Sequence, residues 1–221
     1  MKNRDLFEKN PLFASLQEEE FDQLIAACAR KVFSKNTIIL SEGDQTDSLY
    51  IIYKGKVKVS IIDEQGKEII LSILGPGEYF GEMTALVDGK SRSASVTTRE
   101  SCTVYIITKR DFRNLVSHNP DIVFNLLRGS MERLREANKK IESLALMDVY
   151  GRVARLFTSL AKQNSDQTSI IEEKLTHQDI ANMVGSSREM ISRVMKELSN
   201  GGYISVDKKI IVINGKLPYA W

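Results

Sequence analysis

The first half of the chain consists of short hydrophobic runs that glycines separate. Before these runs, apolar residues recur at helical spacing over residues 16–30, which predicts a short helix. Between residues 32 and 107 the runs are short and rich in β-branched residues, as strands are. They read TIIL, SLYIIYKG, KVKVSIID, EIILSIL, SASVTT and TVYII. Closely spaced strands with glycine turns, as at Gly55 and Gly66, predict a small antiparallel roll or barrel.

One long helix is expected next, over residues 120–147. Its repeating residues are Leu127, Leu134 and Ile141 at one heptad position and Met131, Asn138 and Ala145 at another. Such a stripe favours pairing with a second helix, so we expect a homodimer. A helix that packs only on its own domain is the alternative, because three heptads are close to the minimum for a coiled coil.

The last third of the chain predicts a helix over residues 149–162, a polar loop over 163–169, two further helices and a terminal hairpin. The stretch HQDIANMVGSSREMISRVMKEL divides into a helix over residues 178–184, a turn at Gly185 and a second helix after Ser187. The residues expected to pack between the two helices are Ala181, Ile180, Val184, Ile191 and Val194. These offsets are typical of a helix-turn-helix.

The second of these helices presents Arg188, Glu189 and Arg193. Arginine can donate two hydrogen bonds to guanine and glutamate can accept one from cytosine, so this face predicts recognition of double-stranded DNA. A solvated face with Glu189 and Arg193 paired one turn apart is the alternative. The residues expected to hold DNA phosphates are Thr176, Gln178 and Ser187 at the helix starts, and Lys208 in the hairpin formed by residues 203–206 and 210–213.

The segment GEYFGEMTALVDGKSRSASV, residues 77–96, carries candidate ligand chemistry. Gly81 permits a close approach of the backbone, and Glu82 opens a short helix. Further along, Arg92 supplies a guanidinium, the natural partner of a phosphate. The other candidates are Met83, Ser93 and Ala94 in this segment, and Val59, Leu71 and Leu74 as an apolar wall for a base. An internal Glu82–Arg92 salt bridge that closes an inert roll would use the same pair and is the alternative.

Composition narrows the possible classes of protein. A formal net charge of +2 is too small to show nucleic-acid binding by itself. The two cysteines, Cys28 and Cys102, lack metal-ligand spacing, so no metal site is expected. The absence of a nucleophile–base pair argues against an enzyme. Neither a signal-peptide core nor a run of about 18 apolar residues occurs, so a cytoplasmic protein without membrane contact is expected.

Together these motifs resemble the cyclic-AMP receptor protein branch of the receptor-protein/Fnr superfamily of bacterial transcription regulators, over nearly the whole chain. Gly81-Glu82 followed by Arg92-Ser93-Ala94 resembles that family's phosphate-binding cassette in residue type and spacing. The resemblance implies that Glu82 holds the ribose 2′-hydroxyl of a cyclic nucleotide. It also implies that Arg92 and Ser93 hold the cyclic phosphate.

The stretch SSREMISR resembles the family's recognition helix, which implies that Arg188, Glu189 and Arg193 contact the bases of a TGTGA-like half-site. The implied fold class is α+β. It comprises an N-terminal antiparallel, jelly-roll-like β-roll that binds a cyclic nucleotide, a long dimerisation helix and a C-terminal winged helix-turn-helix. These parts would span residues 1–118, 119–147 and 148–221, with a hinge near Asp148. RNA polymerase is an expected partner.

The long helix departs from the family pattern. Where nucleotide-binding members carry a Thr-Ser pair that contacts adenine, this chain has Ala137 and Asn138. Asparagine keeps a donor and an acceptor for a purine edge, so Asn138 joins the candidate ligand-binding residues. Cyclic AMP is the expected allosteric effector. Cyclic GMP, cyclic di-GMP and ligand-independent DNA binding are the alternatives.

Other classes fit the sequence less well. The family's iron–sulfur sensors need an N-terminal cysteine cluster, and its haem sensors need a histidine in the cassette region. His118 and His177 are interpreted instead as surface or helix-end residues. A nucleotide-binding module that regulates an enzyme would have no use for a helix-turn-helix with charged residues facing outward.

Overall fold

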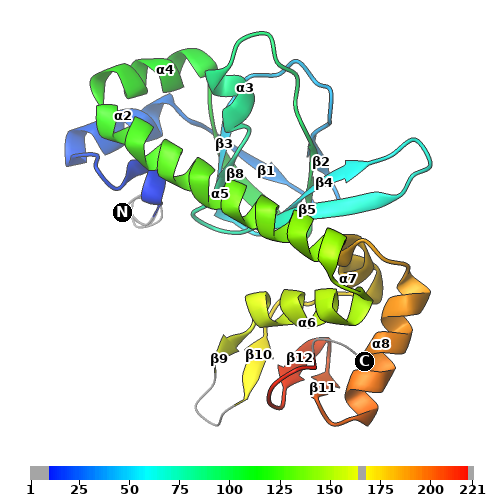
Figure 1. Cartoon of the computed structure of the whole chain (residues 1–221). Coiled ribbons are helices and arrows are strands. Elements are labelled where there is room, and N and C mark those ends of the chain that lie inside the picture. The colour runs from blue at the N-terminus through cyan, green and yellow to red at the C-terminus, as the bar shows by residue number, and fades with distance from the viewer. Residues whose placement is uncertain (1–9, 164–167, 219–221) are drawn as a thin grey trace. The chain divides into compact units, whose positions relative to one another are not determined.

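The computed structural model describes residues 10–163 and 168–218, and these form two compact units (Figure 1). The boundary between the units falls between Leu134 and Arg135, inside the long helix. None of the helices in the described part of the chain combines the length and the apolar character that a membrane-spanning segment needs.

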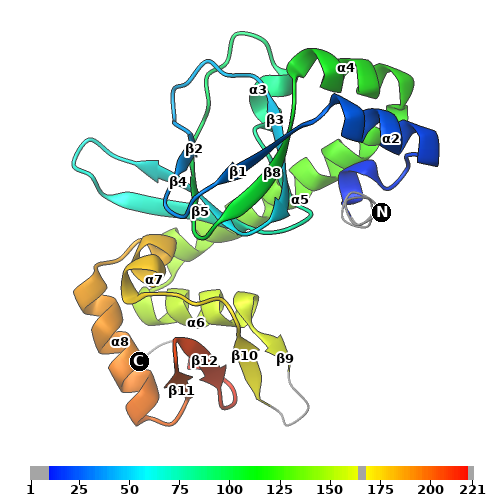
Figure 2. The same ribbon diagram turned by 180° about the vertical axis from the view of Figure 1, so that it is seen from behind.

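The first unit is a β-roll with helices at one end, which Figures 1 and 2 show from opposite sides. Its elements are η1 (Pro11–Phe13), α2 (Glu18–Ala27), β1 (Ala29–Phe33), β2 (Ile38–Leu40), β3 (Leu49–Lys54), β4 (Val57–Ile62), β5 (Glu68–Leu74), β6 (Tyr79–Phe80), α3 (Glu82–Leu86), β7 (Ser95–Thr98), β8 (Cys102–Ile107), α4 (Lys109–His118) and α5 (Pro120–Leu146). Two antiparallel sheets, β1-β8-β3-β6 and β2-β7-β4-β5, form the roll.

Strand β3 lies at the centre of the packing because both of its faces are buried. Leu49 and Ile51 point to a core shared with α2, α4 and the start of α5, where Phe112 and Ile122 are fully buried. The intervening residues of β3, such as Ile52, point to a second core between the two sheets. Successive strand residues face opposite sides, so this one strand joins both cores.

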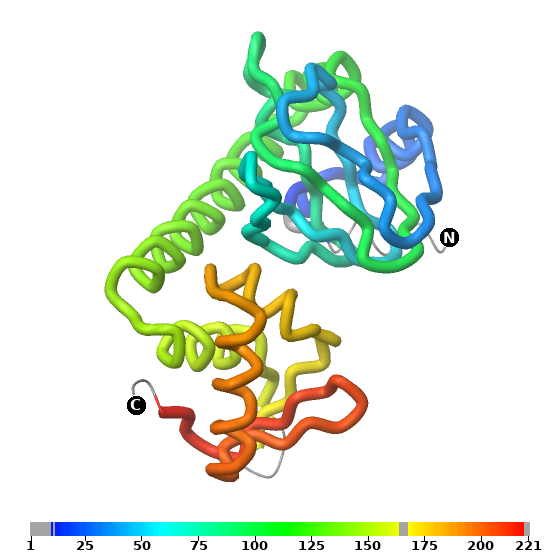
Figure 3. Tube along the Cα trace, turned by 90° about the vertical axis from the view of Figure 1, so that its right-hand side faces the viewer, coloured from blue at the N-terminus to red at the C-terminus, as the bar shows by residue number. Residues whose placement is uncertain are grey.

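The second unit contains the helix-turn-helix and its wing (Figure 3). Its elements after α5 are α6 (Val149–Leu160), β9 (Lys162–Gln163), β10 (Ser169–Ile171), α7 (His177–Val184), α8 (Arg188–Asn200), β11 (Ile204–Asp207) and β12 (Ile210–Ile213). The strands form one sheet in the order β11-β12-β10-β9. Phe157, Ile180 and Val194 bring α6, α7 and α8 into one buried layer.

The predicted fold class is confirmed, with differences in local elements. The expected helix over 16–30 is shorter, because residues 29–33 pair along their whole length with β8 as strand β1. Helix α4 and strand β6 were not predicted. The loop expected over 163–169 is bounded by β9 and β10, and residues 164–167 of it lie outside the described residues.

Two of the turn glycines of the roll, Gly55 and Gly66, allow a direct test of its packing. Gly55 has φ +89° and a Cβ there would lie 2.5 Å from the Ser101 carbonyl oxygen and 2.6 Å from Cys102 Sγ. Gly66 has φ +80° and nothing within 4 Å of the same position. In both alanine variants the left-handed backbone conformation lowers the free energy of unfolding by about 1–2 kcal/mol. Only Gly55→Ala adds a clash with backbone, about 1–3 kcal/mol more.

We therefore expect Gly55→Ala to lower the free energy of unfolding clearly more than Gly66→Ala. Urea denaturation of the two variants and the parent measures the difference. Equal losses would show that the Gly55 turn moves away from the β8 backbone at little cost.

Candidate ligand pocket and DNA-binding surface

Arg92 is the buried cation of the first unit, with 4% of its surface exposed. Its Nη1 donates to the Gly81 carbonyl oxygen at 2.8 Å, its Nη2 to the Ser48 carbonyl oxygen at 2.8 Å and its Nε to Thr46 Oγ1 at 3.0 Å. Burial lowers the pKa of Arg92, because desolvation penalises the charged guanidinium. A guanidinium has five N–H groups, so these three contacts leave donors for an anion.

Gly81 is required at this point by its conformation and by its neighbours. It has φ 83°, in the left-handed region, and caps the start of α3. A Cβ at Gly81 would lie 2.7 Å from Arg92 Nη1 and 2.9 Å from the Ser48 carbonyl oxygen. Only glycine therefore lets the backbone approach the guanidinium this closely.

Glu82 makes its ion pair with Arg133 of α5. Arg133 Nη1 donates to Glu82 Oε1 at 2.9 Å, and Arg133 Nη2 donates to the Tyr79 carbonyl oxygen at 2.6 Å. The guanidinium also lies 4.6 Å from the centre of the Tyr79 ring. The Glu82–Arg92 salt bridge considered from the sequence is thus not formed. Sequence reasoning missed Arg133 because the helix that carries it is distant along the chain.

The remaining cassette residues lie around Arg92. The Ser93 hydroxyl and the Met83 sulfur are 3.5 Å apart, and both residues are exposed. Ala94 is half-buried and lies directly before β7. These side chains leave an accessible hydroxyl next to the buried cation.

The three candidate wall residues do not share one face. Leu74 belongs to the core between the sheets, and Val59 packs against that core. Leu71 lies three positions before Leu74 on β5, on the other face of the strand, and is 42% exposed. The structure therefore brings Val59 and Leu74 together and separates Leu71 from them.

The predicted stripe on α5 is exposed in the single chain. Its large apolar residues and their exposed fractions are Phe124 70%, Leu127 53%, Met131 46%, Leu134 52% and Ile141 63%. Phe124 lies one heptad before Met131 and extends the stripe beyond the residues noted in the sequence. Ala137 and Asn138 are exposed on the same helix.

Hydrogen bonds at the helix ends fix the geometry of the helix-turn-helix. The Thr176 hydroxyl accepts from the Asp179 backbone N–H at 3.0 Å and caps α7, and the Ser187 hydroxyl accepts from the Met190 N–H at 3.1 Å and caps α8. Gly185 ends α7 with φ 65°. Arg152 of α6 donates to the Val184 carbonyl oxygen at 2.8 Å. The predicted phosphate residues Thr176 and Ser187 are therefore also helix caps.

Helix α8 separates its apolar and charged residues. Ile191 and Val194 are fully buried, whereas Arg188, Glu189 and Arg193 are exposed. Within the described ranges, no ion pair joins Glu189 to Arg193. The three charged side chains are therefore available to a partner.

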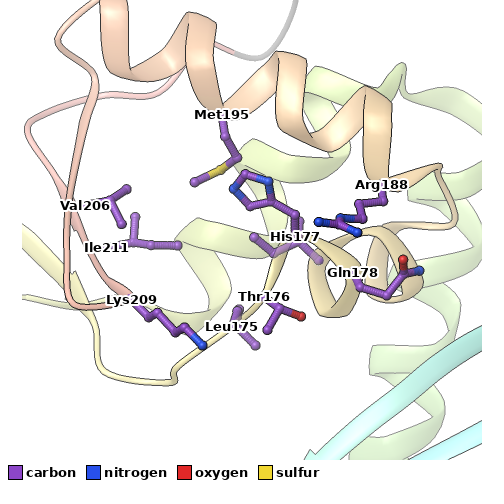
Figure 4. A pocket seen from close by; sticks show the side chains of 10 residues that line it. Leu175, Thr176, His177, Gln178, Arg188, Met195, Val206, Lys209 and Ile211 are labelled. Carbon is purple, nitrogen blue, oxygen red and sulfur yellow. The ribbon is translucent and has the colours of Figure 1, made fainter.

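A groove of about 480 Å³ lies between the start of α7, helix α8 and the wing (Figure 4). Its floor is apolar, and its polar lining residues are Thr176, His177, Gln178, Arg188 and Lys209. Gln178 Nε2 donates to Asn182 Oδ1 at 2.7 Å. His177 and Lys209 were not among the predicted DNA-binding residues, because only the fold brings them beside Arg188.

The tip of the wing is a two-residue turn with an unusual conformation. Lys208 and Lys209 both have positive φ, 47° and 69°. This is the geometry that Asn-Gly adopts most easily, and a residue with a long side chain adopts it at a cost of about 1 kcal/mol or more. The two lysines therefore place positive charge at the tip at a cost in local stability.

Comparison with known proteins matches both units to described families. Residues 30–119 match the cyclic nucleotide-binding domain, and residues 151–216 match the Crp-like helix-turn-helix domain. The chain is 40% identical over 184 residues to the cAMP-activated global transcriptional regulator CRP of Salmonella typhimurium. The aligned region covers 82% of this chain and 87% of that protein. It is 35% identical over 202 residues to the cAMP-activated global transcriptional regulator Vfr of Pseudomonas aeruginosa, with 89% and 94% coverage.

Among solved structures, the c-di-GMP-responsive global regulator CLP of Xanthomonas campestris has a similar fold. Its TM-score is 0.79 at 25% identity, and the match covers 90% of this chain and 100% of that chain.

The contact between Gly81 and Arg92 leads to a test of the pocket. Gly81→Ala should displace the guanidinium and weaken cyclic-nucleotide binding by about 2 kcal/mol or more, as loss of a buried charged partner does. Gly77→Ala is the matched control, because Gly77 has φ +86° and a Cβ there would meet nothing within 4 Å. Isothermal titration calorimetry with cyclic AMP measures both variants. Equal affinities for the two variants would contradict a role for Arg92 in holding the phosphate.

Proposed function

The chain belongs to the Crp family of cyclic-nucleotide-responsive transcription regulators, and on that premise we propose that a homodimer of it binds cyclic AMP and a TGTGA-like palindromic DNA site. The main support for this proposal is that Arg92 is buried and donates to the carbonyl oxygen of Gly81, whose backbone conformation is left-handed. A regulator of this kind acts on the chromosome and on RNA polymerase, so its place is the bacterial cytoplasm.

The pocket suits a ligand that carries one phosphate and one ribose. In the described part of the chain, no carboxylate forms an ion pair with Arg92. Asp47, Glu82 and Asp44 stabilise the Arg92 charge from beyond ion-pair distance, and a cyclic phosphate would supply a counter-charge in direct contact. Glu82 and Ser93 are the groups for the ribose hydroxyl and for a phosphate oxygen. Arg133 holds the Glu82 carboxylate in place through its 2.9 Å contact.

Asn138 bears on the choice of base. Its amide can donate to one purine and accept from another, so either an adenine or a guanine edge can pair with it. Two relatives with 40% and 35% identity are cAMP-activated by name, which supports adenine. Cyclic GMP, which also carries one phosphate and one ribose, is the second candidate. Cyclic di-GMP is the third, because the Xanthomonas regulator responds to that guanine nucleotide.

A second copy of this chain is the partner that fits the stripe on α5. Asn138 interrupts a row of exposed apolar residues in the middle of the helix. A single asparagine at such a position favours two parallel helices in one register, because it meets its counterpart across the seam. The two copies would then present two recognition helices, as a palindromic site requires.

Arg188, Glu189 and Arg193 would contact the base edges of each half-site, and the wing would contact phosphates. Their exposure on one face of α8 and the fixed turn at Gly185 support this assignment. Thr176, Gln178 and Ser187 lie at the starts of α7 and α8, where phosphates bind readily. Ligand-independent DNA binding is the alternative, and it predicts equal DNA affinity with and without nucleotide.

The proposal is tested by titrating the purified protein with cyclic AMP, cyclic GMP and cyclic di-GMP in the calorimeter. DNA binding to a random duplex pool is measured in parallel with each nucleotide. We expect tightest binding of cyclic AMP and nucleotide-dependent selection of a two-fold symmetric site. DNA affinity that ignores every nucleotide would overturn the ligand part of the proposal.

The stripe on α5 allows a test of the dimer. Leu134→Glu places a charge at a residue that is 52% exposed in the single chain, so the fold should tolerate it while the seam should not. Ile62→Glu, at 53% exposure on β4, is the matched control. Sedimentation at micromolar concentration should show a monomer for the first variant and a dimer for the second. A dimeric Leu134→Glu variant would exclude α5 as the seam.

Substitutions in the recognition helix and in the wing should change DNA binding in different ways. Arg188→Ala should cost about 1–3 kcal/mol on the preferred site and relax the preference at one base pair per half-site. A Lys208→Asn, Lys209→Gly variant should keep the preference, reduce the salt slope by about 0.9 for each lost phosphate contact and stabilise the fold. Binding selections and salt titrations measure these effects. An Arg188→Ala variant with an unchanged preferred site would remove Arg188 from the base-reading face.

A further inference from the structure

His177 lies in the groove between the recognition helix and the wing. It is the first residue of α7, and its side chain is exposed. Its Nδ1 is 2.9 Å from Ser192 Oγ of α8. Figure 4 shows the imidazole between Met195 and the Arg188 side chain. Within the part of the chain that the structure describes, Nε2 makes no hydrogen bond, so it is available to a ligand in the groove.

The charged groups that face His177 from the neighbouring elements are cations. Helix α8 contributes Arg188 and the wing contributes Lys209. None of the groove's lining residues, all of them described, carries a carboxylate. On α7 itself, Asp179 accepts hydrogen bonds from the Thr176 backbone N–H at 2.9 Å and from its hydroxyl at 2.7 Å. The groove therefore attracts an anion.

We propose that His177 contacts a backbone phosphate of the bound DNA as an imidazolium, so that DNA binding takes up a proton. This inference rests on the proposed DNA-binding function and adds a proton-linked contact to it. Histidine changes its charge between about pH 5 and 8, and a phosphate in the groove favours the charged form. The proton comes from the solvent and returns to it on dissociation.

Linkage gives the direction of the effect. A group that binds a proton more tightly in the complex than in the free protein strengthens the complex as the pH falls. The DNA affinity should therefore rise from pH 8 to pH 6. Because a phosphate carries no sequence information, the same rise should occur on the preferred site and on unrelated duplex.

The experiment is a fluorescence-anisotropy titration of full-length protein with labelled duplex from pH 8 to pH 6. It is run at constant ionic strength, in phosphate-free buffers and with saturating cyclic AMP. We expect at least about fivefold tighter binding at pH 6, within the limit of tenfold per pH unit for each proton taken up. Calorimetry in buffers of different ionisation enthalpy should show proton uptake on DNA binding.

Three variants isolate His177. His177→Gln can still hydrogen-bond Ser192 but cannot become charged, so its affinity should stay near the pH 8 value of the parent at every pH. His177→Arg carries a permanent charge, so its binding should be tight and independent of pH. His118→Gln alters the chain's other histidine, at the end of α4, and should keep the pH dependence of the parent.

The outcomes separate this inference from the function on which it rests. DNA binding that is sequence-specific but independent of pH overturns the role of His177 and leaves the function standing. A pH dependence that persists in His177→Gln also overturns the role of His177. Absence of specific DNA binding at every pH overturns both.

Discussion

The hydrogen bonds of the Arg92 guanidinium are the interaction on which the first unit's site depends. They reach the carbonyl oxygens of Gly81 and Ser48 and the hydroxyl of Thr46, while the Arg92 backbone N–H donates to the Asp44 carbonyl oxygen at 2.9 Å. One side chain thus joins the loop before β3, the start of α3 and the loop before β7. The side-chain contacts satisfy N–H groups of the buried guanidinium, which would be costly to leave unpaired. The same contacts fix the position of the guanidinium, which is the proposed partner of the cyclic phosphate.

Helix α5 runs through both units and makes contacts within each of them. In its first half, Arg133 bonds Glu82 and the Tyr79 carbonyl oxygen. In its second half, Arg155 of α6 pairs with Glu142 at 2.9 Å, and a Cβ at Gly185 would lie 3.0 Å from Leu144. The boundary between the compact units falls between Leu134 and Arg135 of α5, and the hinge near Asp148 stays a prediction. Asp148 caps α6, accepting from the Gly151 N–H at 2.8 Å.

Local patterns predicted most of the elements, and long-range contacts explain what they missed. Glycine turns and β-branched runs identified the main strands because both are properties of neighbouring residues. Strand β1 is exposed at most of its residues and is defined by its pairing with β8, which no local pattern of ARKVF reveals. Helix α4 has one fully buried residue, Phe112, but Leu115 and Val116 follow it at helical spacing, and Thr108 capping Asp111 is a readable start signal, so this helix was predictable and was missed. In the site, Arg133, His177 and Lys209 acquire a role only through partners on other elements.

The charge that matters for DNA is local, which reconciles a net charge of only +2 with a DNA-binding face. Arg188 and Arg193 lie on the exposed side of α8, and Lys208 and Lys209 lie at the wing tip in left-handed conformations. A tip of Asn-Gly would have less backbone strain, so the two lysines lower local stability. In the proposed complex a phosphate contact would recover this cost, since the strain is present with and without DNA and the attraction only with it. On the proposed function, the strained wing tip and the cationic groove beside it would both be stabilised by bound DNA.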